Sequence, residues 1–208
     1  MADEIRDIIR SSELFWNLTD EELEALASIA KEEIYPAGRH IFVEGEPNTK
    51  FYIVAKGKIS LEMEIHIGSR TKQQVIVDVL EASRCLGWSV FLNQVASMSD
   101  TTLEPSKLLA FDGEQIRQLC AEDTKLGYKV MREIANLVSK RLAMARRTLA
   151  HVLSVTSHDL RAPLATVQSS IDAVTGGFAG EINQKQNDLL LGGKQRIADL
   201  LKMIKQHP

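Results

Sequence analysis

Hydrophobic positions in the first part of the chain change from a helical to a strand-like period near residue 36. Leu23, Leu26, Ile29 and Ala30 follow helical spacing directly after Thr19-Asp20-Glu21-Glu22. Thr19, with Glu22 three residues later, is the signature of a capping box at a helix start. Tyr35-Pro36-Ala37-Gly38 reads as the turn that follows this helix.

Strand-like segments follow this turn. Residues 51–55 are apolar throughout, which predicts a strand that is buried on both faces. Residues 59–67 alternate apolar and polar side chains, which predicts a long strand with Ser60 on its solvent face. Residues 75–79 and 107–111 are further strand candidates, with turns at 45–48 and Gly57. Short strands with frequent turns favour a small antiparallel barrel or jelly roll.

A helical pattern returns at residue 115 and persists to about residue 174. We expect one helix over 115–120 and a much longer one from Asp123-Thr124. The apolar stripe on the long helix predicts a parallel partner helix from a second chain. It comprises Val130, Ile134, Val138, Leu142, Ala145, Leu149 and Val152. We interpret the nearby basic residues as a solvated helix face; the alternative is a DNA contact. These residues are Lys140, Arg141, Arg146 and Arg147.

Beyond residue 157 the helix carries a heptad seam, with His158 on the opposite face. The seam comprises Leu160, Leu164, Val167, Ile171 and Val174. Pro163 should bend or loosen the helix within one turn of His158. Residues 176–180 are rich in glycine and precede a second amphipathic segment over 182–204. This predicts a helical hairpin, and two hairpins would form a four-helix bundle in a dimer.

Composition narrows the possible classes. A net charge of -3 argues against nucleic-acid binding through bulk charge. The chain has no run of 18 apolar residues and no secretory signal, so we expect no membrane span. Cys85 and Cys120 have no metal-ligand spacing, which predicts no metal site, a reducing compartment and a cytoplasmic location.

Residues 12–145 resemble the cyclic-nucleotide-binding fold of the catabolite-activator and fumarate-nitrate regulator family. The resemblance rests on the order and spacing of motifs that match that fold. They are Leu14-Phe15, Thr19–Leu23, Tyr35–Gly38, Ile41-Phe42, Glu44–Pro47, Phe51–Val54 and Gly57–Ile59. It implies a β-roll whose ligand pocket lies beneath a short helix, followed by a long helix that dimerises.

The family's phosphate-binding residues are only partly present. The matching segment is Leu86–Leu92, where Gly87 is kept but Trp88 stands at the glutamate position. Ala96, beside Ser97, stands at the arginine position, and no Arg or Lys lies between residues 84 and 107. Burying a cyclic phosphate without a positive partner is costly, so we predict no ordinary binding of cyclic AMP or cyclic GMP.

We expect the pocket to use Gly87, Trp88, Ser89 and Ser97 for an unidentified small molecule. Trp88 either packs as core or lid, or reshapes the pocket for a different ligand.

Ser157-His158-Asp159-Leu160-Arg161-Ala162-Pro163-Leu164 resembles the phosphoacceptor motif of sensor histidine kinases. Residues 180–186 resemble the start of the second helix of their dimerisation domain, so this resemblance covers about residues 146–205. It implies that His158 accepts a phosphoryl group, with Asp159 as acid/base or orienting carboxylate. Ala162 replaces the Thr or Asn that orients hydrolytic water, which predicts weak phosphatase activity.

Phosphorylation from ATP also needs a nucleotide-binding domain, and no segment after Gly180 matches one. We therefore expect no self-sufficient enzyme, and ATP with Mg²⁺ would act through a separate ATPase domain. The chain is then either the N-terminal part of a longer kinase, which its abrupt end favours, or a stand-alone phosphotransfer protein.

These inferences combine into an α+β homodimer. We predict a β-roll sensor over residues 1–120, a signalling helix over 121–145 and a phosphoacceptor hairpin over 146–208. Its partners would be a response-regulator receiver domain, the ATP-binding domain and the small ligand, with no nucleic acid and no membrane. The alternatives are a transcription regulator of the catabolite-activator type and a non-catalytic ligand-binding dimerisation module.

Overall fold

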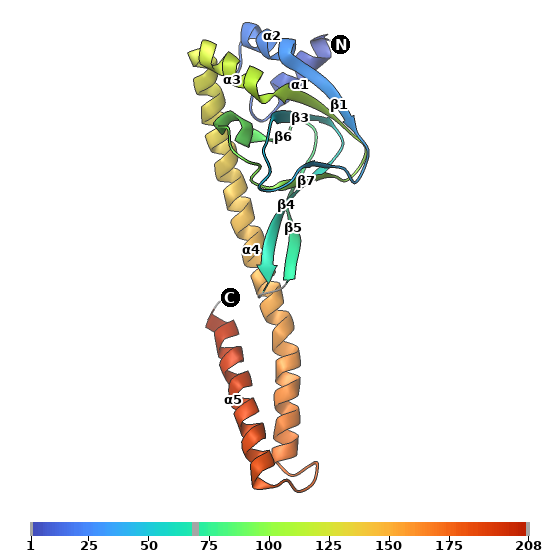
Figure 1. The fold of residues 1–208 in the computed structure, drawn as a ribbon, viewed down its shortest axis with the longest axis vertical. Helices are drawn as coiled ribbons and strands as arrows, with labels where there is room; N and C mark the ends of the chain where they lie inside the picture. Colours follow the sequence, from blue (N-terminus) through green and yellow to red (C-terminus); the bar gives the residue numbers. More distant parts are fainter. Residues whose placement is uncertain (1, 68–70, 207–208) are drawn as a thin grey trace. The chain divides into compact units, whose positions relative to one another are not determined.

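The computed structural model describes residues 2–67 and 71–206 (Figure 1). The chain divides into two compact units, Met1–Met144 and Ala145–Pro208. The first is an antiparallel β-roll with helices and the second is a helical hairpin, so the α+β class and the antiparallel sheet are confirmed. The predicted boundaries at residues 120 and 145 remain predictions.

Two short helices open the first unit, α1 (Ala2–Ser11) and α2 (Asp20–Ile29). The capping box at α2 is confirmed: the Glu22 amide donates to Thr19 Oγ1 at 3.3 Å and the Thr19 amide to Glu22 Oε2 at 2.7 Å. Helix α2 ends at Ile29, so assigning Ala30 to its apolar pattern was wrong. Ala30 instead begins strand β1, because its backbone pairs with Phe111.

Two four-stranded antiparallel sheets make up the β-roll in the described residues. The first has the order β1 (Ala30–Tyr35), β8 (Ser106–Asp112), β3 (Lys50–Lys56) and β6 (Cys85–Leu86). The second has the order β2 (His40–Phe42), β7 (Ser99–Thr102), β4 (Ile59–Ile67) and β5 (Thr71–Leu80). Strands β3, β4, β5 and β8 were predicted from the sequence. Strands β1, β2, β6 and β7 were not, because their residues show no clear alternation of apolar and polar side chains.

Strand β3 is buried on both faces, as its apolar run predicts. Phe51 and Ile53 pack in a core beneath the helices, and Tyr52 and Val54 pack in a second core between the sheets. The predicted solvent face of β4 is wrong at Ser60, which is fully buried. Its hydroxyl donates to the Thr101 carbonyl at 3.1 Å, so the neighbouring strand satisfies it.

Helix α3 (Gly113–Glu122) leads into helix α4 (Thr124–Thr175), which confirms both predicted helices. The interpretation of the α4 stripe was wrong over its first turns, because that stripe is buried in the chain's own β-roll. The buried positions of this stripe within the first unit are Leu126, Val130, Ile134, Leu137 and Arg141. Leu142, assigned to the seam, is 61% exposed, and Arg141, assigned to a solvated face, is 4% exposed.

The second unit contains the last part of α4, a glycine-containing turn and helix α5 (Gln184–Gln206). Lys194 of α5 pairs with Asp172 of α4 at 2.5 Å, which ties the two helices of the predicted hairpin. Helix α4 continues through Pro163 without interruption. Dimeric coiled-coil and four-helix-bundle pairing stay predictions.

Candidate functional site

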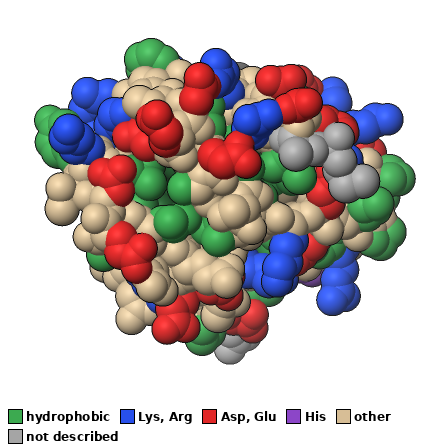
Figure 2. Space-filling view, turned by 90° about the horizontal axis from the view of Figure 1, so that it is seen from above, with side chains coloured by type: hydrophobic (Ala, Val, Ile, Leu, Met, Phe, Trp, Pro, Cys, Tyr) green, Lys and Arg blue, Asp and Glu red, His purple; other side chains and the backbone are tan. Residues whose placement is uncertain are grey.

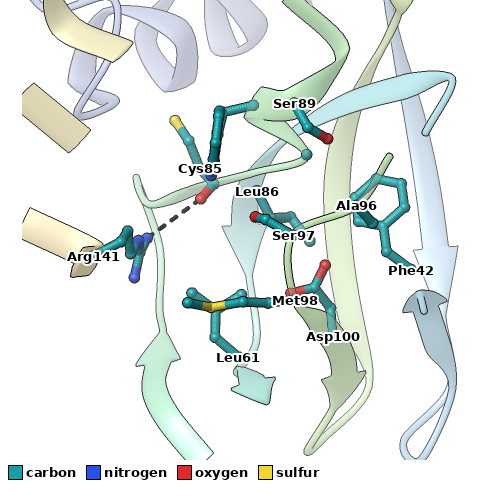
Figure 3. A pocket seen from close by; sticks show the side chains of 12 residues that line it. Phe42, Leu61, Cys85, Leu86, Ser89, Ala96, Ser97, Met98, Asp100 and Arg141 are labelled. Carbon is teal, nitrogen blue, oxygen red and sulfur yellow. Dashed lines mark hydrogen bonds between the residues drawn. The ribbon is translucent and has the colours of Figure 1, made fainter. Parts of the chain in front are cut away.

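A small cavity lies in the β-roll, beside the short 3-10 helix η1 (Trp88–Leu92) (Figure 3). Its volume is about 50 Å³. Side chains and backbone from both sheets, η1 and α4 line it: Phe42, Leu61, Cys85, Leu86, Gly87, Trp88, Ser89, Ala96, Ser97, Met98, Asp100 and Arg141. All four predicted ligand-binding residues, Gly87, Trp88, Ser89 and Ser97, therefore lie at one cavity.

The turn that begins η1 is fixed by Gly87 and Asn48. Gly87 adopts a left-handed conformation with φ of 80°. A Cβ there would lie 2.5 Å from the Lys50 carbonyl oxygen and 2.9 Å from the Phe42 ring. Glycine is thus required by both backbone angle and space. The Asn48 side-chain amide donates to the Gly87 carbonyl at 2.8 Å and to Ser89 Oγ at 2.9 Å.

Asp100 brings a buried carboxyl group to the cavity wall. It lies on β7, opposite Phe42 of β2 and Leu61 of β4, and is 2% exposed. Its Oδ1 atom has no hydrogen-bond partner. Burial raises the pKa of Asp100 well above its usual value, and the Arg141 charge offsets this only in part.

Arg141 reaches the cavity from α4, on another side from Asp100 and Phe42 (Figure 3). Its guanidinium pairs with Asp78 and with Glu13, the latter at 3.3 Å, and donates to the Cys85 carbonyl at 3.4 Å. Burial lowers the pKa of Arg141, while the two carboxylates oppose that effect. Arg141 therefore joins α4 to the cavity wall through partners it already holds.

The predicted phosphoacceptor residues lie in the second unit. His158 is within α4, and its side chain lies outside the described residues. Asp159 follows on the same helix and is exposed. The roles assigned to His158 and Asp159 stay predictions.

Sequence reasoning missed Asp100, Arg141 and Asn48. Asp100 stands in the polar run Ser99–Thr102, which gives no sign that its side chain points inward. For Arg141 a signal existed: it continues the spacing of Val130, Ile134 and Leu137. The basic residues beside Arg141 instead suggested a solvated face, although its spacing puts it on the buried face of α4.

The residues present do not fit a cyclic phosphate. Arg141 is the cationic side chain among the lining residues, and Asp78 and Glu13 already neutralise it. Asp100 would face the phosphate with a carboxyl group instead of a donor-rich cation. The cavity of about 50 Å³ also falls well below the ~300 Å³ of small ligand pockets.

Other site types find little support in the described part of the chain. It contains no group of three or more His, Cys, Asp or Glu side chains that could hold a metal ion. The described helices include none that is both long and apolar enough to cross a bilayer.

Comparison with known proteins identifies the fold of the first unit. The profile of the cyclic nucleotide-binding domain family matches residues 32–123. The cyclic AMP receptor protein of Thermus thermophilus is 25% identical over 194 residues, covering 83% of this chain and 88% of that protein. A CRP-like cAMP-activated global transcriptional regulator of Mycobacterium tuberculosis is 22% identical over 71% of this chain and 62% of its own length.

Solved structures agree on the fold. A cyclic nucleotide-binding domain from Methylobacillus flagellatus aligns with a TM-score of 0.59 and 22% identity, over 71% of this chain and 82% of that one. These comparisons lend no support to the kinase interpretation of residues 146–208. They show that the first unit has the cyclic nucleotide-binding fold, and residues 32–123 match the model of that domain family.

Proposed function

We propose that this chain is a signalling module in which the β-roll cavity controls phosphoryl transfer at His158. The observation that supports this proposal is helix α4, which carries both Arg141 of the cavity and the Ser157–Leu164 segment. A ligand that alters the packing of Arg141 would act directly on the helix that bears His158. Such coupling requires two arrangements of α4 whose balance the ligand shifts.

The hairpin suits the chemistry proposed for His158. A neutral imidazole can attack a phosphoryl group, and the exposed Asp159 beside it can orient the ring or take its proton. Phosphoryl transfer depends mainly on positioning and charge stabilisation, which partner domains would supply. The ATP-binding domain and the receiver domain remain proposed partners.

A second copy of the chain is the proposed partner of α4. Beside the buried stripe lies another apolar series at Met131, Ala135, Val138 and Leu142, of which Val138 also packs partly against the β-roll core. Its spacing of four, three and four residues is that of a coiled-coil seam. Met131 and Leu142 are 43% and 61% exposed in the single chain, which favours a parallel dimer.

Phosphorylation in trans tests this proposal. The chain would be incubated with radiolabelled ATP, Mg²⁺ and the ATPase domain of a histidine kinase. We expect acid-labile label in the wild type and in His151→Gln, which removes an exposed histidine from the same helix. Label should be absent in His158→Gln. Equal labelling of His158→Gln and the wild type would contradict the proposal.

The comparisons favour a second candidate, a transcription regulator of the CRP type, because the Mycobacterium tuberculosis relative carries that description. Such a regulator needs a helix that enters the major groove of DNA. After α4 the described residues form one further helix, α5, and the hairpin offers no helix-turn-helix. On the face seen in Figure 2, acidic and basic side chains are interspersed.

A DNA-retention experiment separates the two candidates. We expect no retention of the chain on a random duplex library at physiological salt, with or without cyclic AMP. Sequence-selective retention would favour the regulator over the phosphotransfer module.

A further inference from the structure

The cavity holds a carboxyl oxygen that lacks a partner. Asp100 Oδ1 is buried without a hydrogen bond, and the Asp100 side chain lies at the cavity wall with Ser97, Met98 and Leu61 around it (Figure 3). An unsatisfied buried polar atom costs free energy, and the cost is recovered when a donor occupies the site. An oxygen of an ionised carboxylate only accepts hydrogen bonds, so the partner that fits Oδ1 of the Asp100 carboxylate is a hydrogen-bond donor.

The charges around the cavity favour a positive group. Arg141 and Arg84 are the cations of the cluster, and Arg84 pairs with Glu13 at 2.9 Å and with Asp78 at 3.0 Å. The carboxylates Glu13 and Asp78 balance these two guanidinium groups. Glu62, whose charge acts on Asp100, and Asp100 itself are additional carboxyl groups. Among these named groups, four carboxyl groups stand against two guanidinium groups.

The dimensions restrict the ligand to a compact one. A volume of about 50 Å³ holds a few water-sized groups. Apolar and weakly polar side chains form most of the remaining wall, including Phe42, Leu61, Leu86 and Met98. A short apolar group attached to the donor would contact these side chains.

We propose that the cavity binds a compact organic cation whose N–H group donates a hydrogen bond to Asp100, in place of a cyclic phosphate. An amidinium or primary ammonium group on a short apolar chain meets this description. The proposal rests on the proposed function only in treating this cavity as the sensor site, and it specifies the ligand class.

Three molecules of matched size test the proposal: acetamidinium, acetamide and acetate. Trp88 lines the cavity, so the variant Trp16→Phe leaves Trp88 as the fluorescent reporter. We expect saturable fluorescence changes, with acetamidinium bound about tenfold more tightly than acetate, which corresponds to ~1.4 kcal/mol. Adding Asp100→Asn should abolish this preference. Glu104→Gln, which removes an exposed carboxylate outside the cavity lining, should preserve it.

Thermal unfolding would confirm that each variant is folded before titration. Equal affinity for acetate and acetamidinium would overturn the proposal, as would an unchanged preference in Asp100→Asn. A response that never saturates, as for a cavity that admits only water, would also overturn it. Asp100-dependent binding in a protein whose His158 is never phosphorylated would refute the proposed function alone.

Discussion

Arg141 and Asp100 are buried charged side chains whose surroundings give opposite consequences. The Arg141 side chain is 5% exposed and is paired with Asp78 and Glu13, so its charge is compensated. Asp100 is equally buried, but its Oδ1 atom has no partner. Arg141 therefore links the cavity wall to α4 through compensated ion pairs. Asp100 instead lowers the stability of the fold, and its Oδ1 atom can accept a hydrogen bond from a ligand.

Replacing Arg141 tests its structural role. Arg141→Met leaves Asp78 and Glu13 without that partner inside the β-roll, which should lower the free energy of unfolding by about 3 kcal/mol. Lys140→Gln, an exposed change on the next position of α4, should stay within about 0.5 kcal/mol of wild type. Urea unfolding followed by tryptophan fluorescence measures both. Equal stability of the two variants would show that the ion pairs contribute little.

Asp100 gives a pH dependence of known sign. Burial raises the pKa of Asp100 in the folded chain, while Arg141 and Glu62 act on it in opposite directions. The unfolded carboxyl group titrates near pH ~3.9. Above that pH the unfolded state loses a proton that the folded state retains, so this residue lowers stability as pH rises to its folded pKa.

Asp100→Asn removes this effect. We expect the variant to melt above the wild type at pH 7, with the difference closing as the pH falls toward about 4, and each ~1 kcal/mol shifting the Tm by about 2–4 °C. Calorimetry of wild type and variant over this pH range provides the measurement. A difference that grows on acidification would contradict the assigned sign.

Among the elements, the turn before η1 depends most on a single residue type. Gly87 and Gly38 both have positive φ, but a Cβ meets the Lys50 carbonyl at Gly87 and open space at Gly38. Alanine at either position destabilises the fold because an L side chain disfavours the left-handed conformation. Gly87→Ala should lower the free energy of unfolding by about 2 kcal/mol more than Gly38→Ala, because its Cβ is overpacked. Chemical unfolding of the two variants measures the difference. Equal losses would mean that the turn relaxes freely.

The elements also show how far a pattern can predict structure. Segments with a clear pattern, such as the apolar run of β3, the alternation of β4 and the helical period of α4, were placed correctly from the sequence. The sequence does not reveal which face of α4 meets the β-roll, because two apolar series share that helix. The face that carries Arg141 is the one that meets the β-roll, because Arg141 is buried there and pairs with Asp78 and Glu13. These partners lie 63 and 128 residues away along the chain. No local pattern encodes such pairs.

At the site, the resemblance to the cyclic-nucleotide-binding family located the Gly87–Ser89 turn and Ser97, because the order of motifs along the β-roll matches that family. Asp100 escaped prediction for a physical reason: its burial arises from pairing with β2 and β4, and polar strand residues usually face water.

For the whole molecule, the account requires a dimer through the apolar series on α4 that includes the exposed Met131 and Leu142. Leu142→Glu places a charge on that series, and we expect it to weaken dimerisation by at least about tenfold. Lys140→Glu, a charge change at an exposed position outside the series, should leave the dimer intact. Sedimentation velocity across a concentration range measures both. A wild type that stays monomeric at high concentration would refute the proposed pairing.

The central claim is that His158 is chemically distinct from the chain's other histidines. Phosphoramidate, a small phosphoryl donor that needs no partner protein, tests it through site-resolved mass spectrometry. The account predicts that His158 is labelled about tenfold faster than His40 or His151, and that Asp159→Asn reduces this advantage. Equal rates at the three histidines, or slower labelling at His158, would contradict it.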